Sequence, residues 1–272
     1  MDDALQSYHS LDGLNLKGSF KAAPKDKDRN LVALFVHGIT ADRDEGGFYA
    51  DIANELAERG IGSLRFDLRS HGASEGEMED LTLFGGLSDI SASRSLLHGL
   101  TDENARIVIV AASFGGGLAV LHAAKHPPTA LVLLNPNLDY AANWLGRPDS
   151  KSLPSPLPAE MRDQLRVHKW APRGEFRLSR AMINEVIHVR PADVMPTIAC
   201  PALTVHGTKD SLVSYDIAQD SYRTAGPSEF LSIDGADHGF VVPGDETFKD
   251  PRTAEYRLDV VRRVLAWLDR FI

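Results

Sequence analysis

The chain has 272 residues, of which 43% are hydrophobic and 25% charged, an ordinary composition for a soluble globular protein. Its formal net charge of −9 is not gathered in blocks, which argues against nucleic acid or an anionic membrane as a partner. The single cysteine, Cys200, excludes an intrachain disulfide. No apolar run reaches membrane-spanning length, and the first residues lack the pattern of a secretory signal. We therefore expect a cytoplasmic location, and the oligomeric state, a homodimer included, stays open.

Strands and helices alternate along the first half of the chain. Residues up to about 30 alternate weakly and predict a β-hairpin at the edge of a sheet. Continuous apolar runs then predict buried strands, and apolar residues at helical spacing predict helices between them. The predicted strands are 31–36, 61–66, 107–112 and 129–134, and the predicted helices are 47–59, 82–100 and 113 to about 125. This alternation is typical of a mostly parallel sheet with flanking helices.

The alternation stops between residues 138 and 195, where only residues 160–170 have a helical pattern and no strand of comparable strength is predicted. It resumes with a strand at 202–207, a helix near 214–224, a strand at 230–233 and a closing amphipathic helix at 253–271. We therefore predict an α/β core formed by residues 1–137 and 196–272. Residues 138–195 would be a cap inserted between the sixth and seventh strands.

The stretch 107–120 predicts a buried strand, a sharp turn and a helix, with Ser113 and three glycines at the turn. A serine on such a strained corner has its hydroxyl pushed out of the sheet, as in the nucleophile elbow G-x-S-x-G. Here Ala111 replaces the first glycine, and it is small enough for the strand and helix to approach closely. The glycines lack the lysine of a phosphate loop and the acid of a dinucleotide site. The pattern therefore favours a nucleophile over a nucleotide site.

A serine hydroxyl is a poor nucleophile unless a base takes its proton, and the base needs an orienting carboxylate. Asp210 and His238 each follow a predicted strand, as Ser113 does, so the three fall at one edge of the sheet. Their order along the chain is the order of the α/β-hydrolase triad. Asp139 is the alternative acid. No metal-ligand spacing is present, so we expect neither a metal nor another cofactor.

Taken together, these motifs resemble the α/β-hydrolase superfamily, and more narrowly the cinnamoyl and feruloyl esterase-type and serine-aminopeptidase-like hydrolases. The resemblance is carried by residues 37–38, 42–49, 65–76, the elbow, 206–210 and 237–240, which span nearly the whole chain outside the cap. It implies the α/β-hydrolase fold, with a mostly parallel central sheet and flanking helices.

The resemblance also implies residue roles. Ser113 would be the nucleophile, His238 the general base and then acid, and Asp210 the orienting acid. The backbone N–H groups of Ile39 and Phe114 would form the oxyanion hole, which stabilises the charge that develops on the carbonyl oxygen. Three other residues of these motifs are interpreted as structural or buried: His71, His206 and Asp237.

Candidate substrate contacts are His37, which shapes the oxyanion loop, and the cap residues Trp144, Trp170 and Met182. The cap residues could equally form the cap's own core. The sequence predicts a serine hydrolase that cleaves a small-molecule carboxylic ester, with an aryl or hydroxycinnamoyl acyl group as the leading substrate. A thioesterase, lactonase or peptidase, and acyl transfer or C–C bond hydrolysis on a natural product, use the same triad. A non-catalytic binding module is the alternative from another class.

Overall fold

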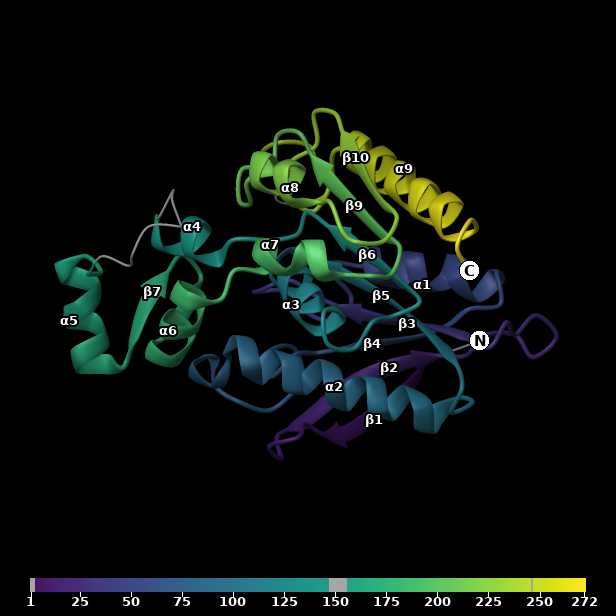
Figure 1. The fold of residues 1–272 in the computed structure, drawn as a ribbon, viewed down its shortest axis with the longest axis horizontal. Helices are drawn as coiled ribbons and strands as arrows, with labels where there is room; N and C mark the ends of the chain where they lie inside the picture. The colour runs from purple at the N-terminus through teal and green to yellow at the C-terminus, as the bar shows by residue number, and fades with distance from the viewer. Residues whose placement is uncertain (1–2, 147–155, 246) are drawn as a thin grey trace.

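The structure is a computed structural model that describes residues 3–146, 156–245 and 247–272. Within these ranges, eight strands form one central sheet in the order β1-β2-β4-β3-β5-β6-β9-β10 (Figure 1). β2 is antiparallel to β1 and β4, and the other neighbouring strands are parallel. The mostly parallel sheet and the hairpin at its edge are as predicted.

The strands of the sheet run through both halves of the chain. They are β1 (Ala4–His9), β2 (Asn15–Lys21), β3 (Leu31–Val36), β4 (Gly62–Phe66), β5 (Arg106–Ala112), β6 (Ala130–Leu134), β9 (Ala202–Gly207) and β10 (Ser228–Ile233). The helices beside them are α1 (Phe48–Glu58), α2 (Leu83–Leu100), α3 (Ser113–Ala123), α8 (Tyr215–Ser221) and α9 (Pro251–Leu268), with a short 3-10 turn at Met78–Asp80.

Both faces of the sheet are covered by helices. Along β3, Leu34 belongs to a buried cluster on one face and Phe35 to a cluster on the other, because side chains alternate along a strand. α2 and α3 cover the first face, and α1 and α9 cover the second. Burial on both faces explains why β3 is a continuous apolar run in the sequence.

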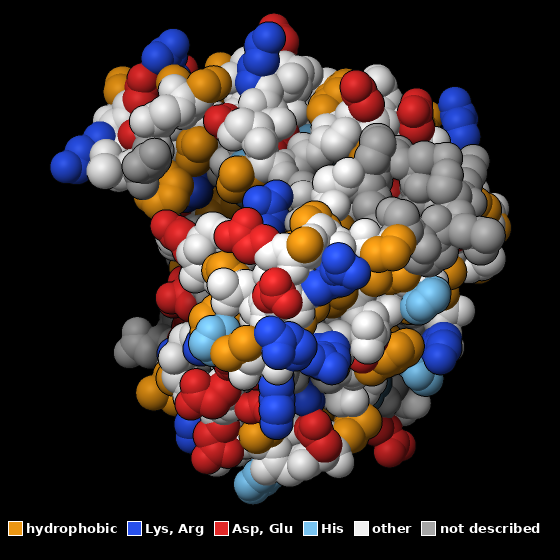
Figure 2. Space-filling view, turned by 90° about the vertical axis from the view of Figure 1, so that its left-hand side faces the viewer, with side chains coloured by type: hydrophobic (Ala, Val, Ile, Leu, Met, Phe, Trp, Pro, Cys, Tyr) orange, Lys and Arg blue, Asp and Glu red, His pale blue; other side chains and the backbone are white. Residues whose placement is uncertain are grey.

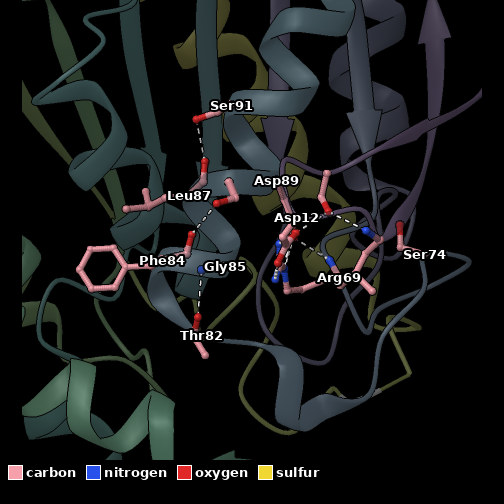
Figure 3. A network of polar contacts seen from close by, with 12 residues as sticks. Asp12, Arg69, Ser74, Thr82, Phe84, Gly85, Leu87, Asp89 and Ser91 are labelled. Atoms are coloured by element: carbon pink, nitrogen blue, oxygen red, sulfur yellow. Dashed lines mark hydrogen bonds and ion pairs between the residues drawn. The ribbon is translucent and has the colours of Figure 1, made fainter.

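A buried arginine fixes the edge hairpin to the rest of the sheet (Figure 3). Arg69, in the loop after β4, donates from Nε and Nη2 to Asp89 of α2, with Nη2 at 2.8 Å from Oδ1. The same guanidinium donates to Asp12, in the turn between β1 and β2, at 2.8 and 2.9 Å. The contacts therefore join three segments that are distant in the chain.

The first part of the segment between β6 and β9 projects from one end of the molecule, at the left of Figure 1, and the last helix of the segment lies beside α3. Its elements are α4 (Tyr140–Leu145), α5 (Ala159–His168), β7 (Trp170–Arg173), β8 (Phe176–Ser179), α6 (Arg180–His188), α7 (Pro191–Val194) and a 3-10 turn at Met195–Thr197. Residues 147–155 of the predicted cap lie outside the described residues.

This inserted segment differs from the prediction, which has a single helix at 160–170, because α4, α6 and α7 are also helical. The helix expected to reach Trp170 ends at His168, because Lys169 adopts a left-handed backbone with a φ of 67°. Trp170 instead begins β7, which pairs with β8 as a separate antiparallel hairpin turning at Gly174. Strands of four residues carry too little alternation to be read from a sequence. The cap boundaries stay a prediction.

Candidate active site

The candidate nucleophile sits where β5 runs directly into α3. Ser113 has a φ of 50°, a left-handed conformation that is strained for a residue other than glycine. A Cβ at Gly115 would lie 2.3 Å from the His37 carbonyl oxygen, so only glycine allows α3 to pack this close to the end of β3. The local sequence therefore folds into the strand-turn-helix corner that it predicts, with Ser113 at the corner.

The candidate base and acid are in direct contact. His238 Nδ1 lies 2.8 Å from Asp210 Oδ2, although 28 positions separate the two residues in the chain. Because a carboxylate only accepts, Nδ1 carries the proton, and this leaves Nε2 of His238 free to accept one. The Asp210 side chain is 0% exposed, whereas that of His238 is 20% exposed.

The alternative acid has other partners. Asp139 accepts a hydrogen bond from the Ala142 N–H at 2.9 Å, which caps the N-terminus of α4, and it pairs with Arg190 at 2.6 Å. Asp237 accepts from the backbone N–H of Ser211 at 2.7 Å and from that of His238 at 2.7 Å. The carboxylate that meets the imidazole of His238 is therefore that of Asp210.

Ser113 and His238 line the same cavity, which has a volume of about 740 Å³. Gly38, Ile39 and Phe114 also line it, so both residues expected to form the oxyanion hole line the same cavity as the candidate nucleophile. A Cβ on Gly38 would lie 3.0 Å from Ser113 Cβ, which shows how closely the loop approaches the elbow. The lining of the cavity therefore includes the candidate nucleophile, the candidate base and both residues expected to supply N–H donors.

The expected substrate contacts divide into two groups. Trp144 lines the cavity, and its ring lies 5.7 Å from that of Phe114. The described residues that line the cavity do not include His37, Trp170 or Met182. Trp170 stacks on His168, and the Met182 side chain is 1% exposed within the apolar cluster of the sheet's α2 and α3 face. Apolar character could be read from the sequence, but the direction in which each side chain points could not.

His37 instead supports the loop that holds Gly38 and Ile39. Its Nδ1 bonds to the Gly38 carbonyl oxygen at 2.7 Å, and its Nε2 accepts the Leu68 N–H at 2.9 Å. Burial lowers the pKa of His37 to about 3, so the ring stays neutral. His71 supports the same loop, since its Nε2 accepts the Thr40 N–H at 3.3 Å. Both histidines therefore contact this loop, and the contact between His71 and Thr40 is one that the sequence did not predict.

Two groups that the sequence reasoning missed, Glu45 and Arg257, line the cavity. Glu45 Oε1 accepts the Gly38 N–H at 2.5 Å, and burial raises the pKa of this carboxyl. Arg257 of α9 donates to the Gly239 carbonyl and lies over the rings of Phe48 and Phe248. His206, which the sequence analysis interprets as a buried residue, is buried, and its Nε2 lies 3.0 Å from Asp210 Oδ2. In the sequence, an acid seven positions after Gly38 is only a weak indication of a site residue. No local pattern indicates that Arg257 belongs to the site.

The charges favour an ionised Asp210 beside a basic His238. Burial by itself would raise the pKa of Asp210, but hydrogen bonds from His206 and His238 outweigh it and hold the pKa below its usual range. Burial would likewise lower the pKa of His238, but the hydrogen bond to Asp210 reverses this and the net pKa is raised. A basic imidazole hydrogen-bonded to a carboxylate can accept a proton from a serine hydroxyl.

The described residues carry neither a metal-binding cluster nor a membrane-spanning helix. Residues 3–146, 156–245 and 247–272 hold no group of three or more His, Cys, Asp and Glu side chains arranged to bind a metal. Over the same ranges, no helix is both long enough and apolar enough to cross a membrane. The cytoplasmic location expected from the sequence stays a prediction.

The sequence of this chain matches known families and proteins. The family model described as serine aminopeptidase, S33, matches residues 27–182. The AB hydrolase superfamily protein YisY of Bacillus subtilis is 26% identical over 216 residues, which are 68% of this chain and 78% of that protein. The palmitoyl-protein thioesterase ABHD10 of Pongo abelii is 27% identical over 163 residues, and the match covers 57% of this chain but only 49% of that protein.

Solved structures share the whole fold. Est1E from Butyrivibrio proteoclasticus, solved with ferulic acid, superposes with a TM-score of 0.70 at 22% identity, covering 95% of this chain and 99% of that one. The α/β-hydrolase GrgF from a Penicillium species superposes with a TM-score of 0.73 at 21% identity, covering 100% and 99%. These likenesses establish the fold. Because the family model matches more than half of the sequence, the chain belongs to the serine aminopeptidase S33 family and is a hydrolase of the α/β-hydrolase superfamily.

Proposed function

We propose that this hydrolase cleaves a carboxylic ester through an acyl-enzyme intermediate, with Ser113 as nucleophile, His238 as base and Asp210 as orienting acid. The observation that carries the proposal is the 2.8 Å contact from His238 Nδ1 to Asp210, made by a histidine that lines one cavity with Ser113. A histidine without an orienting carboxylate would leave the serine unactivated.

The proposed reaction has two halves. Ser113 Oγ attacks the ester carbonyl carbon while His238 Nε2 takes its proton, and the N–H groups of Ile39 and Phe114 stabilise the oxyanion. The C–O bond to the alcohol then breaks, and the alcohol leaves with the proton from His238. Water, deprotonated by His238, attacks the acyl-enzyme and releases the acid and the free serine.

The lining of the cavity supports an aromatic or extended acyl group. Its wall includes the rings of Phe48, Trp144, Phe176 and Phe240, and its volume of about 740 Å³ is sufficient for a small organic ligand. The end of the molecule where the inserted segment projects shows interspersed acidic, basic and hydrophobic side chains, without one dominant sign of charge (Figure 2). This surface favours neither a polyanionic nor a polycationic substrate, and Est1E, whose fold is shared, was solved with ferulic acid.

The experiment is a turnover panel with the purified protein and with Ser113→Ala. The panel holds p-nitrophenyl esters of short and long acids, methyl ferulate, an acyl-thioester and a lactone. We expect Ser113-dependent turnover with preference for the aryl ester, and no turnover by Ser113→Ala. Preference for the thioester would move the proposal to the second candidate, which the relative named as a palmitoyl-protein thioesterase favours.

A fluorophosphonate probe separates catalysis from binding, because an unactivated serine does not react with it. Labelling of Ser113 without turnover of any ester in the panel would indicate a reactive serine whose substrate is not in the panel. Absence of both labelling and turnover, in a folded protein, would contradict the proposal and favour a non-catalytic binding module.

A further inference from the structure

We propose that His206 is a positioning residue, which holds the Asp210 carboxylate in the orientation that His238 requires. The proposal rests on the proposed function, in which Asp210 and His238 are the acid and the base. Two imidazoles meet one carboxylate oxygen: His206 Nε2 lies 3.0 Å and His238 Nδ1 lies 2.8 Å from Asp210 Oδ2. Asp210 therefore links a histidine that faces the cavity to a second one that is fully buried.

The surroundings of His206 determine which ring nitrogen carries its proton. Nε2 has two neighbours, the Asp210 carboxylate and the Val213 carbonyl oxygen at 3.3 Å, and both can only accept. Nδ1 of His206 is buried and has no hydrogen-bond partner among the described residues. A second proton on that nitrogen would be buried without an acceptor, so the ring donates from Nε2.

The Asp210 carboxylate depends on this donor because it has no access to water. Its Oδ1 accepts the N–H groups of Leu212 at 3.0 Å and Val213 at 2.7 Å. Its Oδ2 accepts from His238 Nδ1 at 2.8 Å and lies 3.0 Å from His206 Nε2. The side chain is 0% exposed, so solvent cannot replace a donor that is removed. Without His206, Oδ2 would keep His238 as its only partner among these groups.

The position of His206 in the fold makes it a rigid anchor. It lies on β9, which is paired on both sides, with β6 and β10. Its ring packs edge-on against Tyr215 of α8 at 5.7 Å between ring centroids. Asp210 lies in the loop just after β9, so the contact with His206 ties this loop to the central sheet.

Loss of the donor should change two measurable quantities. The carboxylate would be less well oriented toward His238, and small misplacements of this kind lower turnover by on the order of 10- to 100-fold. An N–H donor also draws negative charge from Oδ2. Its removal should strengthen the attraction between Asp210 and protonated His238, so the acid limb of the activity profile should move to higher pH.

The experiment compares His206→Leu, His206→Gln and the control His122→Leu. His122 on α3 is also a buried histidine with an unpartnered Nδ1, so its replacement reproduces the loss of a buried imidazole away from Asp210. The readouts are the pH dependence of fluorophosphonate labelling at Ser113 and kcat and KM on the best ester of the panel. Folding of each variant is checked by its thermal unfolding.

We expect His206→Leu to slow labelling and kcat by about tenfold or more, with little change in KM and a shifted acid limb. His206→Gln keeps an N–H donor at similar reach and should recover most of the rate, and His122→Leu should match the wild type. A folded His206→Leu with the wild-type rate and profile would overturn the role of His206 and leave the proposed function intact. A wild-type protein that is never labelled would overturn both.

A measurement on the wild-type protein covers the case in which His206→Leu does not fold. Two strongly hydrogen-bonded imidazole N–H protons should appear downfield in the proton NMR spectrum, one from each histidine on Asp210. Asp210→Asn should move both signals. If only the signal of His238 moves, His206 does not donate to Asp210 and the proposal is wrong.

Discussion

Two buried aspartates organise different regions of this protein, and their partners differ in one decisive property. The side chains of Asp89 and Asp210 are both 0% exposed. Asp89 faces the guanidinium of Arg69, which is held on its other side by Asp12 (Figure 3). Asp210 faces two imidazoles, one of which lines the cavity.

A guanidinium keeps its proton at any pH at which the protein is folded, whereas an imidazole gains and loses one near neutrality. Asp89, Arg69 and Asp12, the Asp89 cluster, therefore keep fixed charges, which suits them to joining the edge hairpin to α2. In the Asp210 cluster, formed by Asp210, His206 and His238, the carboxylate lies beside an imidazole that can exchange protons with a ligand. The buried carboxylate of Asp89 therefore serves stability, and that of Asp210 serves the proposed chemistry. The variants below separate these two roles.

The largest expected effect is on turnover. Asp210→Asn should lower kcat by on the order of 10⁴-fold, because an amide neither stabilises protonated His238 nor fixes its tautomer. The measurement is kcat on the best ester, with unfolding recorded in parallel. Asp139→Asn is the matched control and should stay active per folded molecule. Loss of activity in Asp139→Asn with normal activity in Asp210→Asn would reverse the assignment of the acid.

The next effect is on stability. Asp89→Ala leaves the Arg69 guanidinium, which is 4% exposed, without its buried partner. Removal of one partner from a buried ion pair costs about 3–5 kcal/mol, so urea unfolding should show a loss of that size. Labelling of Ser113 in the folded fraction should not change. Asp259→Ala, which removes an exposed partner of Arg263, should cost less than about 1 kcal/mol, and an equal loss in both variants would contradict the comparison.

The sequence was sufficient for the parts of the fold that are specified locally. β3 and β5 are buried on both faces, so each is a continuous apolar run, and the elbow glycines mark a close approach of α3 to β3. Ser113, Asp210 and His238 each follow a strand of a parallel sheet. Strand ends alone therefore predict that they share an edge, although Asp139 also satisfies this condition and only its contacts distinguish it.

The remaining features depend on contacts between distant segments. Arg257 donates to the carbonyls of Gly46 and Gly239, and no pattern around Arg257 indicates a place beside the cavity. The contact between His206 and Asp210 spans only four positions, but it requires the turn after β9, which periodicity does not describe. Trp170 and Met182 were identified by apolar character, which does not specify whether a side chain faces a cavity or a core.

The pH dependence of activity should reflect the Asp210 cluster. His238 must be neutral to take a proton, and its pKa is raised above the ordinary value of about 6.5 by the hydrogen bond to Asp210, against burial. Activity should therefore rise with pH and reach half its maximum above about pH 6.5, falling about tenfold for each unit below that point. A kcat/KM profile on a neutral ester measures this. Half-maximal activity well below pH 6 would contradict the raised pKa.

The smallest expected effect is on stability, and it distinguishes Asp12 from Asp89, the two partners of Arg69. Hydrogen bonds from the Arg69 guanidinium lower the pKa of Asp12 to about 2, below the value of about 3.9 in an unfolded chain. A lowered pKa stabilises the fold above about pH 4, and this contribution is lost as the pH falls through about 2. Because the Asp12 side chain is 55% exposed, solvent screens the pair, and Asp12→Asn should cost less than about 1 kcal/mol near neutral pH. Unfolding free energies measured across this pH range should converge for wild type and Asp12→Asn at the acid end. A loss as large as that of Asp89→Ala would mean that the exposed partner, and not the buried one, holds Arg69.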